Sequence, residues 1–238
     1  MIDRACQSKT KRKNFNLKNN NQKITFPRLF IHCAPHSEIT CQEHFSSENL
    51  KPSLTNSVTE ILMEENSSLN YLLLQNETLA NYHFSSLNLE QKAHSKFSAH
   101  TLSYGGKLVR NDIRVNLNGQ KASCYLRGLF LLKAKQQGVN YTLIKHNKPK
   151  TSSQEHYNGL ITDQAHGVFD GQISVSKNAP KTKAEQILYR ISDRLNAIDI
   201  AVEKNEKLLI KVIHQTNELF KAFVVMNDVV YGVMSPNK

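Results

Sequence analysis

Between about Pro27 and Thr182 the sequence consists of short segments in which apolar and polar residues alternate, and this alternation most constrains the fold. In the segment 109–117, the apolar residues Val109, Ile113 and Val115 share one parity, and polar residues occupy the other. Side chains of a strand point alternately to its two faces, so the pattern predicts a half-buried strand. About eleven such segments recur at a spacing of roughly 8–15 residues, which is typical of an all-β protein.

Other segments predict strands in the same way. Their apolar positions are Cys124, Leu126, Gly128, Phe130 and Leu132; Val139, Tyr141 and Leu143, which oppose Asn140 and Thr142; and Phe169, Ile173 and Val175. The region shows no convincing helical period, which argues against α/β folds because their parallel strands need crossover helices. A sandwich, a barrel and a solenoid remain.

Recurring phrases favour the solenoid. Each places small polar residues before a strand, and their first residues lie 27, 27 and 44 positions apart: ENSSLNYLLL (65–74), KAHSKFSAHTL (92–102), GQKASCYLRGL (119–129) and DQAHGVFDGQI (163–173). Stacked β-coils have repeats of about 20–30 residues. The sequence therefore favours a β-solenoid over 27–182.

The two ends of the chain differ from this core. Residues 1–26 are predicted to be a disordered basic leader, since positions 1–23 are polar and carry +6 of the net charge of +11. Residues 183–238 are predicted to be a helical segment that ends in a short hairpin around Asn227-Asp228. The helical stripe consists of Ile187, Ile191, Leu195, Ile198 and Val202.

Composition limits the possible environments and partners. No apolar run approaches the ~20 residues that a membrane helix needs, and four cysteines are too few for a disulfide framework in 238 residues. We therefore expect a cytoplasmic protein without a membrane partner. Because the positive charge is concentrated in the leader, nucleic acid is not the expected partner, although a nucleic-acid-binding module that uses the leader stays an alternative.

Candidate chemistry is sparse. The residues Cys33, His36, Cys41 and His44 form a C-x2-H-x4-C-x2-H arrangement that could ligate zinc. However, Cys41 and His44 differ by an odd number, so a regular strand points them to opposite faces. No phosphate-binding or nucleophile-elbow motif is present. A second alternative is a carbohydrate-active β-helix protein, but its expected acids, Asp112, Asp163 and Asp170, fall on separate segments.

Four long phrases match one known family in order: PSLTNSVTEILMEENSSLNYLLLQNET (52–78), SAHTLSYGGKLVRNDIRVNLNGQKASCYLRGLFLL (98–132), TLIKHNKPKTSSQEHYNGLI (142–161) and HGVFDGQISVSKNAPKT (166–182). On these phrases, residues 27–182 resemble the SufB/SufD core family of the SUF iron–sulfur assembly system, and its SufD members in particular. The match is expected to stop after Thr182, with the family's SufC-docking helices unmatched.

The resemblance implies a right-handed parallel β-helix. It also implies that the chain is a non-catalytic scaffold that pairs with SufB through the ends of the two β-helices. An iron–sulfur cluster would pass only transiently through the complex, without stable binding to this chain. The last matched segment supplies the candidate partner-binding residues Phe169, Gly171, Ile173 and Val175, and an uncovered solenoid end would also permit self-association. Because family members are longer, we expect a truncated or frameshifted copy.

Overall fold

The computed structural model describes residues 10–19, 24–48, 51–192, 223–226 and 229–232. It divides into one unit that ends at Ile191 and a second that begins at Ser192. One sheet contains β1 (Thr10–Asn19), β4 (Glu38–Ser47), β6 (Ser68–Asn76), β8 (Lys96–Ser103), β10 (Ser123–Leu132), β12 (Ser152–Ile161) and β14 (Lys183–Ser192). The other contains β2 (Ile24–Thr25), β3 (Arg28–Cys33), β5 (Ser53–Met63), β7 (Asn81–Gln91), β9 (Leu108–Leu117), β11 (Gln137–His146) and β13 (His166–Val175).

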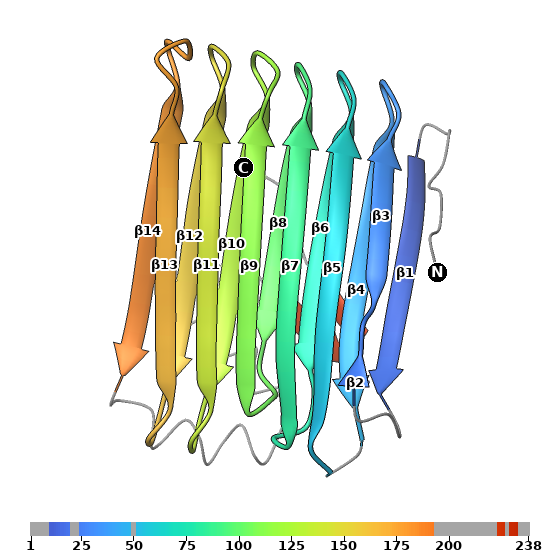
Figure 1. Cartoon of the computed structure of the whole chain (residues 1–238), viewed down its shortest axis with the longest axis vertical. Coiled ribbons are helices and arrows are strands. Elements are labelled where there is room, and N and C mark those ends of the chain that lie inside the picture. Colours follow the sequence, from blue (N-terminus) through green and yellow to red (C-terminus); the bar gives the residue numbers. More distant parts are fainter. Residues whose placement is uncertain (1–9, 20–23, 49–50, 193–222, 227–228, 233–238) are drawn as a thin grey trace. The chain divides into compact units, whose positions relative to one another are not determined.

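The first unit is a parallel β-solenoid (Figure 1). The chain alternates between the two sheets from β3 onward, so each strand pairs in parallel with a strand of the next turn rather than with its sequence neighbour. In the ladders from β1 to β13, paired residues lie 26 to 30 positions apart, as in the Tyr82–Leu108 and Glu38–Ser68 pairs. The prediction of an all-β, parallel solenoid is therefore confirmed.

The core lies between the two sheets. Side chains of one parity enter it from both sheets and stack on equivalent positions of the neighbouring strands, as Leu69 does on Phe97. Leu69, Leu89, Phe97, Val115 and Leu126 are all at most 1% exposed. Full burial of one such side chain stabilises the fold by roughly 1.5–3 kcal/mol. The alternation of apolar and polar residues in the sequence therefore matches the alternation of inward-facing and outward-facing side chains along most of the strands.

The turns that lead from the β3 sheet to the β4 sheet repeat one backbone design, and we call them the turn column. They occupy residues 34–37, 64–67, 92–95, 118–122, 147–151 and 176–182. Each has one residue with a positive φ: His36, Asn66, His94, Lys121, Lys150 and Lys181. In five of the six the next residue is Ser or Thr, whose hydroxyl donates to the carbonyl three positions earlier, as Ser67 does to Glu64 at 2.6 Å.

The prediction of a disordered leader is wrong for part of that segment. Residues 10–19 form β1, which pairs in parallel with β4 at the end of the sheet, and Ile24–Thr25 pairs with β5. The apolar residues Phe15 and Leu17 are two positions apart, so both face the core and pack against it. Main-chain pairing with β4 and these two contacts offset the cost of ordering a polar segment.

The prediction of a helical C-terminal segment is wrong for residues 183–192, which form β14. The spacing of Ile187 and Ile191 fits a helix, but pairing with the edge of β12 determines the conformation. Residues 193–222 lie outside the described part of the chain. The predicted hairpin is confirmed, because β15 (Phe223–Met226) and β16 (Val229–Gly232) pair antiparallel. Among the described residues, no helix is long and apolar enough to cross a membrane.

Two finer expectations are also corrected. In β11 the polar residues Asn140 and Thr142 face the core, and Val139 and Tyr141 are on the other face, half-buried. The phrase at 163–173 belongs to β13, in the opposite sheet from the first three phrases. The equivalent of those three is the stretch 149–158, because Ser152 aligns with Ser123 in the ladder.

Candidate functional site

The candidate partner-binding residues lie on β13, the last strand of its sheet. Phe169, Gly171 and Ile173 point inward but are only half-buried, because no further strand of that sheet follows in the described residues. Val175 is 52% exposed. The structure therefore brings the four predicted residues together on one edge strand.

The strand β14 ends the other sheet beside the same rung. It exposes two large apolar side chains, Leu188 at 44% and Tyr189 at 49%, and Val168 of β13 is 50% exposed. An edge strand also presents unpaired main-chain groups to which another strand can add. The two edges together form a candidate interface, which we call the last rung (residues 166–175 and 183–192).

A hydrogen bond fastens the last rung to the interior. The Gln186 amide of β14 donates to Glu155 Oε2 at 2.7 Å. The Gln186 side chain passes over Gly171, where a Cβ would clash with its amide nitrogen. Burial raises the pKa of Glu155, although hydrogen bonds from Thr142 and Gln186 partly oppose this shift. A Cβ at Gly171 would therefore push the flexible end of the Gln186 side chain out of this contact.

Aromatic stacking links β13 to the preceding turns. The ring of Tyr157, which is 1% exposed, lies 4.6 Å from the ring of Phe169 between centroids. Tyr157 occupies the space above Gly128, where a Cβ would overlap the ring. Phe169 is therefore anchored to the core on one side and partly uncovered on the other.

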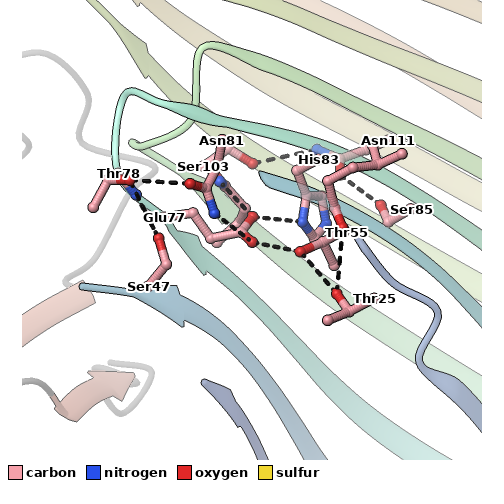
Figure 2. Close-up of polar contacts among 12 residues, drawn as sticks. Thr25, Ser47, Thr55, Glu77, Thr78, Asn81, His83, Ser85, Ser103 and Asn111 are labelled. Atoms are coloured by element: carbon pink, nitrogen blue, oxygen red, sulfur yellow. Dashed lines mark hydrogen bonds and ion pairs between the residues drawn. The ribbon is translucent and has the colours of Figure 1, made fainter. Parts of the chain in front are cut away.

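A buried polar network lies near the middle of the solenoid (Figure 2). Its centre is Glu77, whose Oε2 lies 2.7 Å from His83 Nδ1. Thr55 and Asn81 donate to Glu77 Oε1 at 2.7 and 3.5 Å, and Gln75 donates to Oε2 at 3.2 Å. Burial raises the pKa of Glu77, but the hydrogen bonds and the charge of His83 outweigh burial, so the pKa is below its ordinary value.

Figure 2 also shows a second set of polar contacts, which is centred on Asn111. Asn111 Nδ2 donates to Ser103 Oγ at 3.2 Å and to Asn140 Oδ1 at 3.1 Å, and Ser85 Oγ donates to Asn111 Oδ1 at 2.6 Å. The bond to Asn140 Oδ1 gives the inward-facing amide of Asn140 a buried partner, which offsets part of the cost of turning this polar residue inward.

A second buried acid, Glu43, has the opposite electrostatic balance. Its Oε2 accepts hydrogen bonds from Thr59 Oγ1, at 2.8 Å, and from the Tyr71 hydroxyl. Burial nevertheless raises the pKa of Glu43 above its ordinary value. These residues line a cavity of about 10 Å³, which is near the minimum for one water molecule.

The four residues considered as weak zinc-ligand candidates are divided between two environments. Cys33 and Cys41 are buried in the core, His36 is in a turn with positive φ, and His44 lies on the other face of β4 from Cys41. Burial raises the pKa of Cys33 to about 12 and raises that of Cys41 as well. Among the described residues, no group of three or more His, Cys, Asp or Glu side chains could hold a metal ion.

The acids considered for carbohydrate cleavage are also separated. Asp112 of β9 and Asp170 of β13 align with Tyr141 of the intervening strand β11. Asp112 pairs with its own neighbour Arg110 at 2.9 Å. Asp163 lies in a turn, where its carboxylate accepts from the N–H of Ala134. These three aspartates therefore do not form a pair of facing carboxylates.

Sequence reasoning missed the buried acids Glu43, Glu77 and Glu155. The available signal was parity: Glu43 shares its face with Cys41 and Phe45, and Glu155 shares its face with Tyr157. An acid on the apolar parity of a predicted strand indicates a buried carboxylate that needs partners.

These features define a class: a two-sheet parallel β-solenoid whose last rung ends in exposed apolar edge strands. The family described as "SUF system FeS cluster assembly, SufBD core domain" matches residues 15–190. The chain therefore belongs to the SufBD core domain family. The match begins before the predicted boundary at 27 and continues beyond Thr182, so the expectation that it stops after Thr182 is wrong.

Named relatives agree with this family. The chain is 25% identical over 158 residues to the iron–sulfur cluster assembly protein SufD of Escherichia coli, covering 66% of this chain and 37% of the relative. It is 26% identical over 181 residues to the SufD protein of Plasmodium berghei, covering 75% of this chain and 13% of the relative. It is 26% identical over 166 residues to protein ABCI7, chloroplastic, of Arabidopsis thaliana, covering 69% and 35%. The chain thus spans little more than a third of these relatives, or less.

Proposed function

We propose that the chain acts as a SufD-like scaffold in SUF iron–sulfur cluster assembly, without catalysis of its own, and that its last rung binds SufB. The observation that carries this proposal is the exposed apolar edge of the last rung, in a chain that belongs to the SufBD core domain family. Cluster atoms are cargo in this scheme, and no residue of this chain is assigned as a stable cluster ligand.

The chemistry of the last rung suits a protein partner. Val168, Val175, Leu188 and Tyr189 combine about half-exposed apolar surface with two strand edges. Apolar and aromatic side chains supply much of the affinity at protein interfaces, and edge strands supply main-chain hydrogen bonds. SufB is the proposed partner because the family resemblance implies pairing through the β-helix ends. A SufC contact and a cytoplasmic location are secondary parts of the same proposal.

A matched pair of variants tests the interface. Val175 of β13 and Ile24 of β2 are both 52% exposed, and they lie on the terminal strands of opposite ends of one sheet. V175D places a charge in the last rung, whereas I24D places the same charge at the far end. We expect V175D to weaken SufB binding by about tenfold or more, and I24D to leave binding unchanged.

The measurement is co-purification of the full 238-residue chain with SufB and, separately, with SufC, followed by titration of the variants. Equal binding by the two variants would place the SufB interface elsewhere. Failure of the unmodified chain to bind either protein would overturn the scaffold proposal. A fluorescent fusion in intact cells tests the location, and exclusion from the cytoplasm would contradict that part.

A further inference from the structure

The charge of the turn column changes sign along the solenoid. The second turn contains Glu64 and Glu65. The last three turns and the first residue of β14 contain no acidic residue and six lysines, which we call the lysine column: Lys121, Lys148, Lys150, Lys177, Lys181 and Lys183.

The backbone holds these lysines in neighbouring, equivalent positions. The N–H of Lys121 donates to the carbonyl of Pro149 at 3.1 Å, and the N–H of Lys150 donates to that of Pro180 at 3.0 Å. Successive turns are therefore about one strand spacing apart, roughly 4.8 Å. Lys121, Lys150 and Lys181 have φ values of 57°, 59° and 60°, so they leave the turn with the same local backbone geometry.

The lysine column lacks internal charge compensation. All six side chains belong to exposed residues, and none forms an ion pair with a carboxylate in the described part of the chain. In the third turn, by contrast, Lys92 pairs with Glu64 at 4.0 Å. Six uncompensated positive charges on one ridge create a field that attracts anionic partners.

We propose that the lysine column binds an acidic, extended protein segment rich in Asp and Glu. The turns 118–122, 147–151 and 176–182 contain neither arginine nor an aromatic residue. Sites for single-stranded nucleic acid typically add aromatic stacking platforms, and arginine is the preferred bidentate ligand of phosphate. Lysine alone provides point charges in a row, which suits a row of carboxylates. This surface does not depend on SufB binding and can be measured on the chain alone.

The test is fluorescence anisotropy of the full chain with a labelled oligo-glutamate peptide. The variant K121N/K150N/K181N removes three charges and keeps side chains that tolerate a positive φ, as Asn66 does in the second turn. The control K13Q/K107Q/K135Q removes three charges from exposed lysines outside the turn column. We expect about tenfold weaker binding for the first variant and less than about twofold for the control.

A second variant, K148Q/K177Q/K183Q, removes three charges at positions without a positive φ and should lose affinity similarly. Equal losses in the control and in both column variants would show attraction to net charge alone and overturn the proposal. Tighter binding of a single-stranded oligonucleotide of equal charge, lost in the same column variants, would overturn it in favour of nucleic acid. We also expect binding of the oligo-glutamate peptide to weaken steeply as salt is added.

Discussion

Glu77 and His83 form a buried carboxylate–imidazole pair, with 2.7 Å between Glu77 Oε2 and His83 Nδ1 and at most 1% of either side chain exposed. Both side chains point into the core, so water cannot take the place of either partner if the other is removed. Its contribution to stability depends on the ionisation of Glu77.

We predict that E77Q lowers the free energy of unfolding by about 1–3 kcal/mol at neutral pH. The pKa of Glu77 is below its ordinary value of 4.5, so its contribution is complete above that value and is lost as the pH falls through the lowered pKa. The difference between E77Q and the unmodified protein should therefore shrink in acid. Urea unfolding across this pH range measures it, and a difference that grows on acidification would contradict the assignment.

Glu43 should show the opposite sign. Its pKa is raised by burial, so the folded state holds a proton that the unfolded state releases above its ordinary value of 4.5, and stability falls as the pH rises through the raised pKa. We predict that E43Q removes this loss. Relative to the unmodified protein, E43Q should gain stability as the pH rises from 4.5 through the raised pKa of Glu43. A relative loss of stability over that interval in the same urea experiment would show that Glu43 is held as a carboxylate.

The Gly171–Gln186 contact predicts a non-additive pair of substitutions. G171A should cost about 0.5–1.5 kcal/mol, because its Cβ would displace the Gln186 amide and break its hydrogen bond to Glu155. In a Q186A background the cost should fall, since the colliding group is gone. Chemical denaturation of the two single variants and the double variant measures the coupling. Additive costs would mean that the contact with Phe169, not Gln186, limits position 171.

The three described cysteines should be unreactive in the folded protein. Burial raises the pKa of Cys33 to about 12 and the pKa values of Cys41 and Cys124 as well, so few thiolates form at neutral pH. A C6S variant removes the remaining cysteine, which lies outside the described residues. We predict that this variant reacts with a thiol-specific disulfide reagent only after unfolding. Rapid reaction of the native variant would show that a core thiol is accessible.

The strand β1 predicts that part of the polar N-terminal segment is structural. F15S should lower the free energy of unfolding by about 1–2 kcal/mol, because Phe15 packs on the core while half-buried. K13S is the matched control, since Lys13 is exposed on the same strand, and should change stability by less than about 0.5 kcal/mol. Thermal unfolding of the two variants decides the matter. Equal and negligible effects would mean that β1 adds nothing to stability.

The sequence predicted most of the solenoid because local pattern and tertiary pairing agree in many strands. In β9, Val109, Ile113 and Val115 are apolar, share a parity and are buried. In β11 the local pattern and the tertiary pairing disagree. Asn140 faces the core because it accepts a hydrogen bond from Asn111, which lies 29 positions away in the sequence. No local period reveals such a partner.

The ends show the same limit. Ile187 and Ile191 fit a helical stripe as well as a strand, and pairing with β12 selects the strand. The candidate partner-binding residues Phe169 and Ile173 lie at a sheet edge because the last matched motif coincides with the last strand of that sheet among the described residues. The Gln186–Glu155 bond that holds the last rung was not predictable, since it joins residues of two strands whose register is set by turns.

The order of strands in the two sheets determines how the solenoid can unfold. Each strand is paired only with strands one turn before and one turn after it, so no single contact holds the first turns to the last. Opening can begin at either end and advance one rung at a time, and the middle rungs open last. Protection of amide hydrogens from exchange should therefore rise from both ends toward β7, β8 and β9. The last rung, which is proposed to bind a partner, is thus among the parts of the solenoid that open most easily.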